Sequence, residues 1–190
     1  TFTLTTVIDP GGKAVTIRGV TDESGAPLTV LDGGGTGRVL QCVNGEGADT
    51  IFENLVIQNG FASGNAPDNL GGGMFNDAAS PTLENCRFTN NSATYRGGGM
   101  YNSGGSPSLT NCTFTSNEVL SGGDSSGGGM FNGGGRPTLD NCTFTNNKAS
   151  YSGGGMYNMA GSPALTNCTF TSNEAPYGGG GMLNDSSSPD

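Results

Sequence analysis

Carboxylates are the side chains that would have to carry hydrolytic or metal-assisted chemistry here, because the 190-residue sequence contains no histidine. A polysaccharide lyase or hydrolase needs carboxylates that act as acid and base or hold calcium, together with Arg or Lys, on one face. The outward acids Glu84 and Asp140 are instead separated by a repeat that carries Thr110 at the same position. We therefore predict no catalytic residue, no metal site and no cofactor.

A looser acidic group occurs in the first third of the chain. Glu46, Asp49 and Glu53 lie close together in a stretch without regular pattern. Carboxylate oxygens are ligands for calcium, so this group is a candidate cation site. The simpler interpretation, which we favour, is a solvated turn, since acidic side chains are mostly exposed.

A stripe of large side chains follows the methionine of a recurring Gly-Gly-Gly-Met block. We expect these side chains to point outward, where aligned rings can stack sugars or pack against another protein. The alternative is that the stacked rings only stabilise a sheet. The stripe consists of Phe75, Tyr101, Phe131, Tyr157 and Leu183.

A second outward stripe is built from Thr-x-Thr pairs, which resemble the threonine rows of ice-binding solenoids. The alternative interpretation is that threonine simply suits exposed strands. The array is three repeats deep, and Arg87 occupies the position at which a fourth would begin. Its members are Thr113, Thr115, Thr143, Thr145, Thr169 and Thr171.

These stripes depend on an internal repeat. The methionines of the Gly-Gly-Gly-Met blocks are separated by 26, 30, 26 and 26 residues, and they are Met74, Met100, Met130, Met156 and Met182. Four blocks are followed by an aromatic residue and Asn, a polar turn, and then Pro-x-Leu-x-Asn-Cys-x-Phe-Thr-x-Asn. The longest separation is explained by one insertion, at residues 118–126. Such a fixed period is typical of a solenoid, whose coils supply one another's core.

The pattern within each repeat predicts strands rather than helices. No segment has a 3.6-residue period, and three short alternating stretches are separated by Gly, Asn or Pro. We predict an all-β right-handed parallel β-helix with three strands per coil and about seven coils, roughly 34 Å long at a spacing of about 4.8 Å. It would form one domain over residues 1–190, irregular over 1–70 and regular over 71–190.

In-register stacking would place like residues over like. Leu139, Cys142 and Phe144 and their equivalents should point inward, and three ladders of asparagine should lie at corners, where stacked amides satisfy one another. The ladders are Asn76, Asn102, Asn132, Asn158, Asn184; Asn85, Asn111, Asn141, Asn167; and Asn91, Asn117, Asn147, Asn173.

The same stacking decides how two further sequence features are interpreted. Asn111, Asn141 and Asn167 each begin an Asn-Cys-Thr glycosylation sequon. We interpret these sequons as accidental, because we expect this corner to be buried. The four cysteines of the repeat should be buried free thiols, since in-register side chains point the same way, and Cys42 has no evident partner. The four are Cys86, Cys112, Cys142 and Cys168.

Charge and hydropathy restrict the partners. The net charge is −9 and the seven basic residues are scattered, which argues against nucleic acid. No apolar run is long enough to span a bilayer, and no signal peptide is recognisable, so we predict no membrane insertion. Because the sequence begins at Thr1 rather than Met, we expect a processed chain or part of a longer one.

The repeat resembles those of right-handed parallel β-helix proteins and, more narrowly, those of polymorphic outer-membrane proteins. That family carries Phe-x-x-Asn and Gly-Gly-Ala-Ile signatures, of which the second departs here to Gly-Gly-Gly-Met. The Phe-x-x-Asn element recurs at residues 88–91, 114–117, 144–147 and 170–173. The resemblance implies an exported, surface-associated, adhesin-like solenoid located outside the cell or on its surface.

The ends of the sequence suggest how such a solenoid could assemble. Neither end shows a cap, and residues 186–190 stop where another strand is due. We expect the strand-like residues 1–7 to pair with the rim of a neighbouring copy, head to tail, which generates a filament. The residues involved would be Thr1, Phe2, Leu4, Val7, Met182 and Leu183.

The sequence therefore leaves three functional hypotheses. The first is a non-enzymatic structural or adhesin-like solenoid that joins itself or a surface. The second is a binding module that takes a glycan through the aromatic stripe or ice through the threonine array. The third is a fragment of a polysaccharide-active enzyme whose catalytic residues lie elsewhere.

Overall fold

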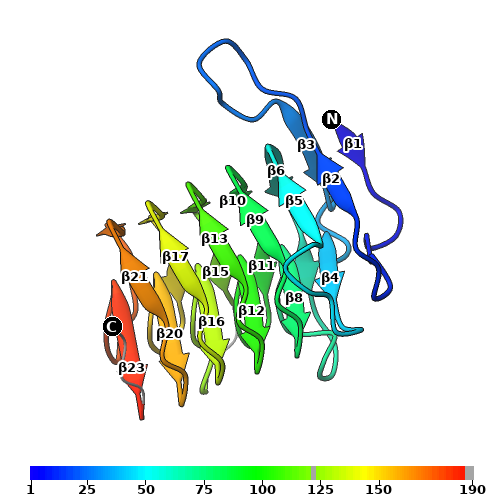
Figure 1. Ribbon diagram of the computed structural model, residues 1–190. Coiled ribbons are helices and arrows are strands. Elements are labelled where there is room, and N and C mark those ends of the chain that lie inside the picture. The colour runs from blue at the N-terminus through cyan, green and yellow to red at the C-terminus, as the bar shows by residue number, and fades with distance from the viewer. Residues whose placement is uncertain (121–122, 187–190) are drawn as a thin grey trace.

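The computed structural model describes residues 1–120 and 123–186 and consists of short strands wound into a rod, with the N-terminal turns at one end and the C-terminal turns at the other (Figure 1). Residues 121–122 of the predicted insertion and 187–190 of the predicted uncapped end lie outside the described residues. Among the described residues there is no helix, and hence no helix that could cross a membrane.

The strands form four parallel sheets stacked along the rod, of which three have six or seven strands and the fourth has four. The Met sheet contains β4 (Leu40–Cys42), β8 (Met74–Asp77), β12 (Met100–Ser103), β16 (Met130–Gly133), β20 (Met156–Met159) and β23 (Met182–Asp185). The Leu sheet contains β2 (Thr16–Arg18), β5 (Ile51–Glu53), β9 (Thr82–Glu84), β13 (Ser108–Thr110), β17 (Thr138–Asp140) and β21 (Ala164–Thr166).

The other two sheets complete each turn. The Phe sheet contains β1 (Phe2–Thr3), β3 (Thr29–Asp32), β6 (Leu55–Gln58), β10 (Arg87–Thr89), β14 (Thr113–Thr115), β18 (Thr143–Thr145) and β22 (Thr169–Thr171). The short sheet contains β7 (Phe61–Ala62), β11 (Ser92–Ala93), β15 (Glu118–Val119) and β19 (Lys148–Ala149).

The predicted all-β parallel solenoid of about seven turns is confirmed, but the prediction of three strands per coil is wrong. A regular coil passes through the Met, Leu, Phe and short sheets, so it has four strands. The strands of the short sheet have two residues each. Two residues are too few to produce a visible alternation in sequence. For the same reason β15 lies inside the segment predicted to be an inserted loop.

Single residues in the left-handed conformation make the corners beside the Phe sheet. Asn85, Asn111 and Asn141 connect the Leu and Phe sheets at φ of 50–55°, and Asn90 and Ser116 make the next corner. Asparagine tolerates this region better than most side chains. At the third corner Gly97 has φ of 67°, and a Cβ on Gly99 would lie 2.5 Å from the carbonyl oxygen of Gly129 in the next coil. Glycine is required there because successive coils touch through backbone.

The core consists of ladders of identical side chains, as predicted. Met100 pairs with Met130, Leu109 with Leu139 and Phe114 with Phe144 across adjacent coils. Their side chains are buried, and neighbouring rings of the Phe ladder have centroids 4.7 Å apart. The apolar side chains of each coil therefore pack against those of the coils above and below it.

Two asparagine ladders run through the interior. In one, the Nδ2 atoms of Asn91, Asn117 and Asn147 donate to the Oδ1 atom of the asparagine in the next coil at 2.9–3.0 Å. Their backbone N–H groups donate to the same oxygens. In the other, Asn76 donates to Asn102 at 2.7 Å. These amides replace the water that buried polar groups would otherwise need.

The third predicted ladder is not buried. Asn111, Asn141 and Asn167 are exposed, because a one-residue left-handed bend turns the side chain away from the core. Asn141 still donates a side-chain hydrogen bond to Asn111. The expectation of a buried corner was wrong, so burial gives no reason to dismiss the Asn-Cys-Thr sequons.

The cysteine ladder lies on the inner side of the same corner. Cys86, Cys112 and Cys142 are buried and Cys168 is half-buried, and all four are free thiols. The Sγ atom of Cys142 contacts the carbonyl oxygen of Leu109 in the preceding coil at 3.6 Å. The hydrogen bond with Cys112, together with burial, raises the pKa of the Cys142 thiol.

We predict that Asn117→Ala destabilises the fold far more than Thr115→Ala. The first change removes the oxygen that accepts from the buried backbone N–H and side chain of Asn91, and the amide that donates to the carbonyl of Phe88 and to Asn147. Its cost should be on the order of 3 kcal/mol, whereas the outward Thr115 should cost within about 0.5 kcal/mol. Equal midpoints of urea unfolding for the two variants would contradict the ladder.

We also predict that native alkylation at pH 8 spares Cys86, Cys112 and Cys142 and modifies Cys168 slowly. Alkylation needs the thiolate form of cysteine. The raised pKa of Cys142 keeps its thiol protonated at pH values well above those at which thiols usually ionise. Mass spectrometry should find all of these sites modified after unfolding in denaturant. Rapid modification of Cys142 in the native protein would show that the ladder is open.

Candidate functional site

The threonine array lies on the outer face of the Phe sheet. Thr113 pairs with Thr143 and Thr143 with Thr169, and the second row is aligned in the same way. The structure adds Thr89, which pairs with Thr115 and extends the second row by one coil. The array lines a shallow hollow of about 440 Å³ bordered by Val56 and Arg87. The structure thus brings the predicted threonines together in two aligned rows, of which Thr169 and Thr171 lie beyond the hollow.

The aromatic stripe faces outward from the Met sheet but is covered. Ring centroids of successive members are 5.2–5.5 Å apart. The guanidinium of Arg38 lies 4.6 Å from the ring centroid of Phe75, and that of Arg96 lies 4.7 Å from Phe131. Phe75 is 6% exposed and Phe131 is 0% exposed. The expectation of open ring faces for sugar stacking is therefore wrong for Phe75 and Phe131.

The two tyrosines of the stripe are only half-buried, and their hydroxyl groups are protonated at neutral pH. Burial raises the pKa of Tyr101. Burial and a 3.0 Å hydrogen bond from its hydroxyl to Asp185 raise the pKa of Tyr157 to about 12. These groups can donate hydrogen bonds but are not suited to act as bases near pH 7.

The acidic group of the irregular region is not a cluster. Glu46 is 2% exposed, and its carboxylate accepts hydrogen bonds from the backbone N–H groups of Gly12 at 2.8 Å and Asn44 at 3.0 Å. Glu53 forms an ion pair with Arg18, and Asp49 is exposed. Among the described residues no three acidic or sulfur ligands gather. Glu46 is thus not part of a solvated turn but a buried acceptor that fixes two loops.

One pair of acids lies closer than the sequence analysis assumed. Glu53 in β5 pairs in register with Glu84 in β9, so Glu84 has an acidic neighbour in the adjacent coil. The sequence carries a signal for this pairing, because residues 52–54 (Phe-Glu-Asn) have the same pattern as residues 83–85 (Leu-Glu-Asn). Arg18 is in register with Glu53 on the side away from Glu84 and forms an ion pair with it. The three residues therefore form one ion pair and one additional carboxylate, that of Glu84.

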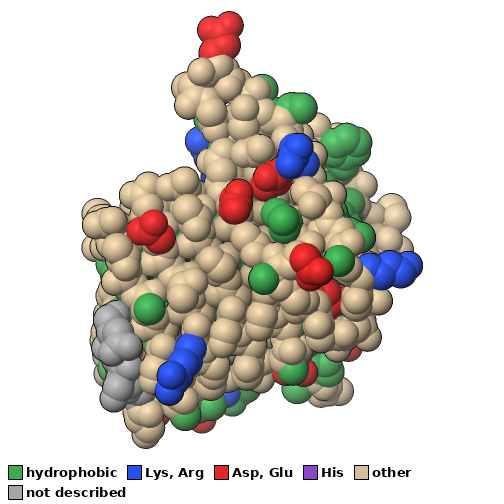
Figure 2. All heavy atoms as spheres, viewed as in Figure 1, with side chains coloured by type: hydrophobic (Ala, Val, Ile, Leu, Met, Phe, Trp, Pro, Cys, Tyr) green, Lys and Arg blue, Asp and Glu red, His purple; other side chains and the backbone are tan. Residues whose placement is uncertain are grey.

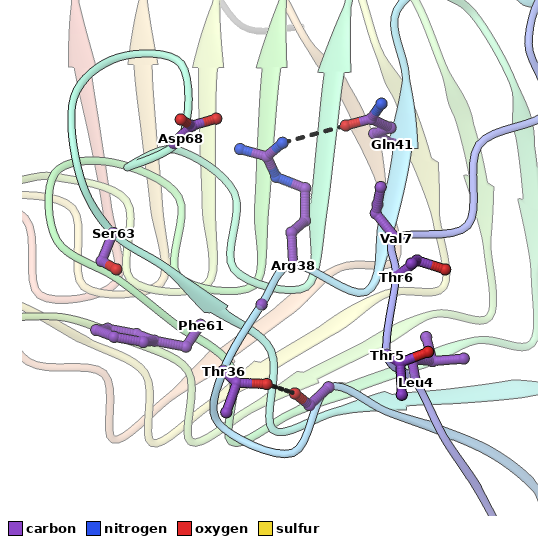
Figure 3. A pocket seen from close by; sticks show the side chains of 12 residues that line it. Leu4, Thr5, Thr6, Val7, Thr36, Arg38, Gln41, Phe61, Ser63 and Asp68 are labelled. Atoms are coloured by element: carbon purple, nitrogen blue, oxygen red, sulfur yellow. Dashed lines mark hydrogen bonds between the residues drawn. The ribbon is translucent and has the colours of Figure 1, made fainter.

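A cavity of about 380 Å³ lies on the side of the first coils, and no motif in the sequence predicted it. It is lined by residues 4–7, by the turn that carries Thr36 and Arg38, and by Phe61, Ser63 and Asp68 (Figure 3). Arg38 projects into its centre and donates from Nη1 to the side chain of Gln41 at 3.3 Å. Three successive turns of irregular chain build this site, so no repeat could reveal it.

The residues predicted to serve in assembly lie at opposite ends of the rod (Figure 1). β1 pairs with β3 of its own chain, and Phe2 is 62% exposed. Met182 and Leu183, in β23, pair with Met156 and Tyr157. The charged side chains are scattered over the face seen in Figure 2, with no large patch of one sign.

Comparison with known proteins agrees with this geometry. A family model described as a right-handed β-helix region matches residues 14–190. No curated protein and no solved structure matches the chain. The narrower resemblance to polymorphic outer-membrane protein repeats stays a prediction. Because the match spans nearly all of the sequence and agrees with the stacked parallel sheets, the chain belongs to the right-handed β-helix family.

Proposed function

We propose that this chain is a non-enzymatic, adhesin-like structural solenoid, located outside the cell or on its surface, whose copies stack head to tail. The observation that carries the proposal is that the two ends of the rod share one register of inward-facing apolar side chains. Exported adhesin-like rods are also what the resemblance to outer-membrane repeats implies.

The shared register can be followed through each sheet. In the Phe sheet, Phe2 stands in the inward column that ends at Phe170. In the Met sheet, Ile8 bridges to Leu40 and stands in the column that ends at Met182. In the Leu sheet, Ile17 stands in the column that ends at Leu165. Each of these three inward columns thus begins and ends with an apolar residue.

In this proposal the contact differs from the predicted pairing of residues 1–7 with the Met182 strand. Because β1 belongs to the Phe sheet, the β1 strand of a second copy would extend that sheet beside β22. Ile8, rather than residues 1–7, would lie over Met182 in β23. Such stacking would bury the exposed Phe2 ring against the half-buried Phe170 and add parallel backbone hydrogen bonds.

We predict that Phe2→Lys raises the concentration needed for assembly at least about tenfold, because it removes an apolar contact of roughly 2 kcal/mol. Thr3→Lys places the same charge on the outward face of the same strand and should leave assembly unchanged. Sedimentation velocity over a concentration series measures the effect, and electron microscopy should show thin uniform rods. A wild-type chain that stays monomeric, or equal effects of the two lysines, would contradict head-to-tail stacking.

A surface-binding role through the threonine array is the second candidate. The in-register rows that line the outer hollow support it, since they present regularly spaced hydroxyl and methyl groups. The glycan alternative through the aromatic stripe is not carried forward, because Arg38 lies over Phe75 and Arg96 over Phe131, which leaves no continuous row of open rings.

If the array binds ice, the chain should inhibit ice recrystallisation, and Thr143→Lys in the middle of the array should abolish the effect. Thr138→Lys, on the Leu sheet of the same coil, is the matched control and should retain full activity. Absence of activity in the wild type, or loss in both variants, would rule out this candidate.

A further inference from the structure

The side cavity of the first coils has the size and shape of a small-molecule site. Its volume of about 380 Å³ falls within the range of roughly 300–1,000 Å³ that is usual for ligand pockets. The walls come from three successive turns of the chain, and the open space lies between residues 4–7 and the Ser63 and Asp68 side chains (Figure 3). Phe2, Ile8 and Ile17, whose columns would continue into the next copy, do not line it, whereas Leu4 and Val7 of the first turn do.

Arg38 holds the walls in place. Its Nη2 atom donates to the carbonyl oxygens of Pro67 at 2.8 Å and Leu70 at 2.7 Å, and its Nε atom donates to that of Gly71 at 3.1 Å. The guanidinium therefore fixes the loop that carries Ser63 and Asp68. The backbone N–H of Phe61 donates to Gly37 at 2.9 Å and fixes the opposite wall. The cavity is preformed, which lowers the entropic cost of binding.

The charges in the cavity argue for an uncharged ligand. The guanidinium fork of Arg38 is occupied by backbone carbonyls, so it cannot bind a ligand carboxylate or phosphate in the bidentate manner. Asp68 attracts Arg38 across the cavity, and the two formal charges cancel. An anionic ligand would also approach a chain whose net charge is −9.

The remaining lining groups are those that a polyhydroxylated ring requires. Thr5, Thr6 and Ser63 offer hydroxyl groups that both donate and accept, and the Asp68 carboxylate accepts. Phe61 supplies an aromatic surface for the C–H face of a ring. We propose that this cavity binds one ring of a neutral sugar, which would give the solenoid a lateral attachment point.

Saturation-transfer difference NMR with the methyl glycosides of glucose, galactose, mannose and N-acetylglucosamine tests the proposal. At least one of these probes should bind the wild-type chain, and both Phe61→Ala and Asp68→Asn should weaken that binding at least tenfold. The matched controls are Tyr177→Ala and Asp77→Asn, which change an exposed ring and an exposed acid outside the cavity and should bind as the wild type does.

Asp68 is exposed, so we expect Asp68→Asn to leave the fold intact. If Phe61→Ala unfolds the coil, the Asp68→Asn variant alone tests sugar binding. Binding that survives Asp68→Asn would overturn the proposal. A wild-type chain that binds none of the four neutral glycosides would also overturn it. The same holds if glucuronate or glycine, which carry charged groups and are added as competitors, displaces the bound glycoside.

Discussion

Parallel in-register stacking is the constraint on which the rest of this structure depends. Each strand donates its backbone hydrogen bonds to the coil beside it, at a spacing of about 4.8 Å. The inward positions of the repeat therefore have the same kind of residue above and below. Methionine, leucine, phenylalanine and asparagine are compatible with such neighbours, whereas like charges repel. The chain accordingly has only 12% charged residues.

Charged side chains that contact rings or backbone groups of the rod occur where coils differ from one another. Arg38 and Arg96 lie over rings of the aromatic stripe, and Glu46 accepts hydrogen bonds from two backbone N–H groups. None of the three repeats in the adjacent coil, so none has a like charge stacked on it. The ladders thus provide a uniform rod, while these single residues create the particular surfaces, including the side cavity.

The same distinction explains how much the sequence could predict. The Met, Leu, Cys and Phe columns followed from the repeat, because a repeated position has one environment. Asn117 and Asn141 look alike in sequence, yet the first is buried in a ladder and the second is an exposed left-handed corner. The covered stripe and the cavity were not predictable, since Arg38, Phe61 and Asp68 come from segments without repeats that meet only in the folded chain.

A double-mutant cycle between Asn117 and Asn147 tests the stacking register most directly, because the two amides can couple only if adjacent coils are aligned residue for residue. The account predicts a coupling energy of about 1 kcal/mol or more for Asn117→Ala with Asn147→Ala. Asn117→Ala combined with Asn132→Ala, in the other buried ladder, should be additive within about 0.5 kcal/mol. Additive effects for Asn117 and Asn147 would contradict the register.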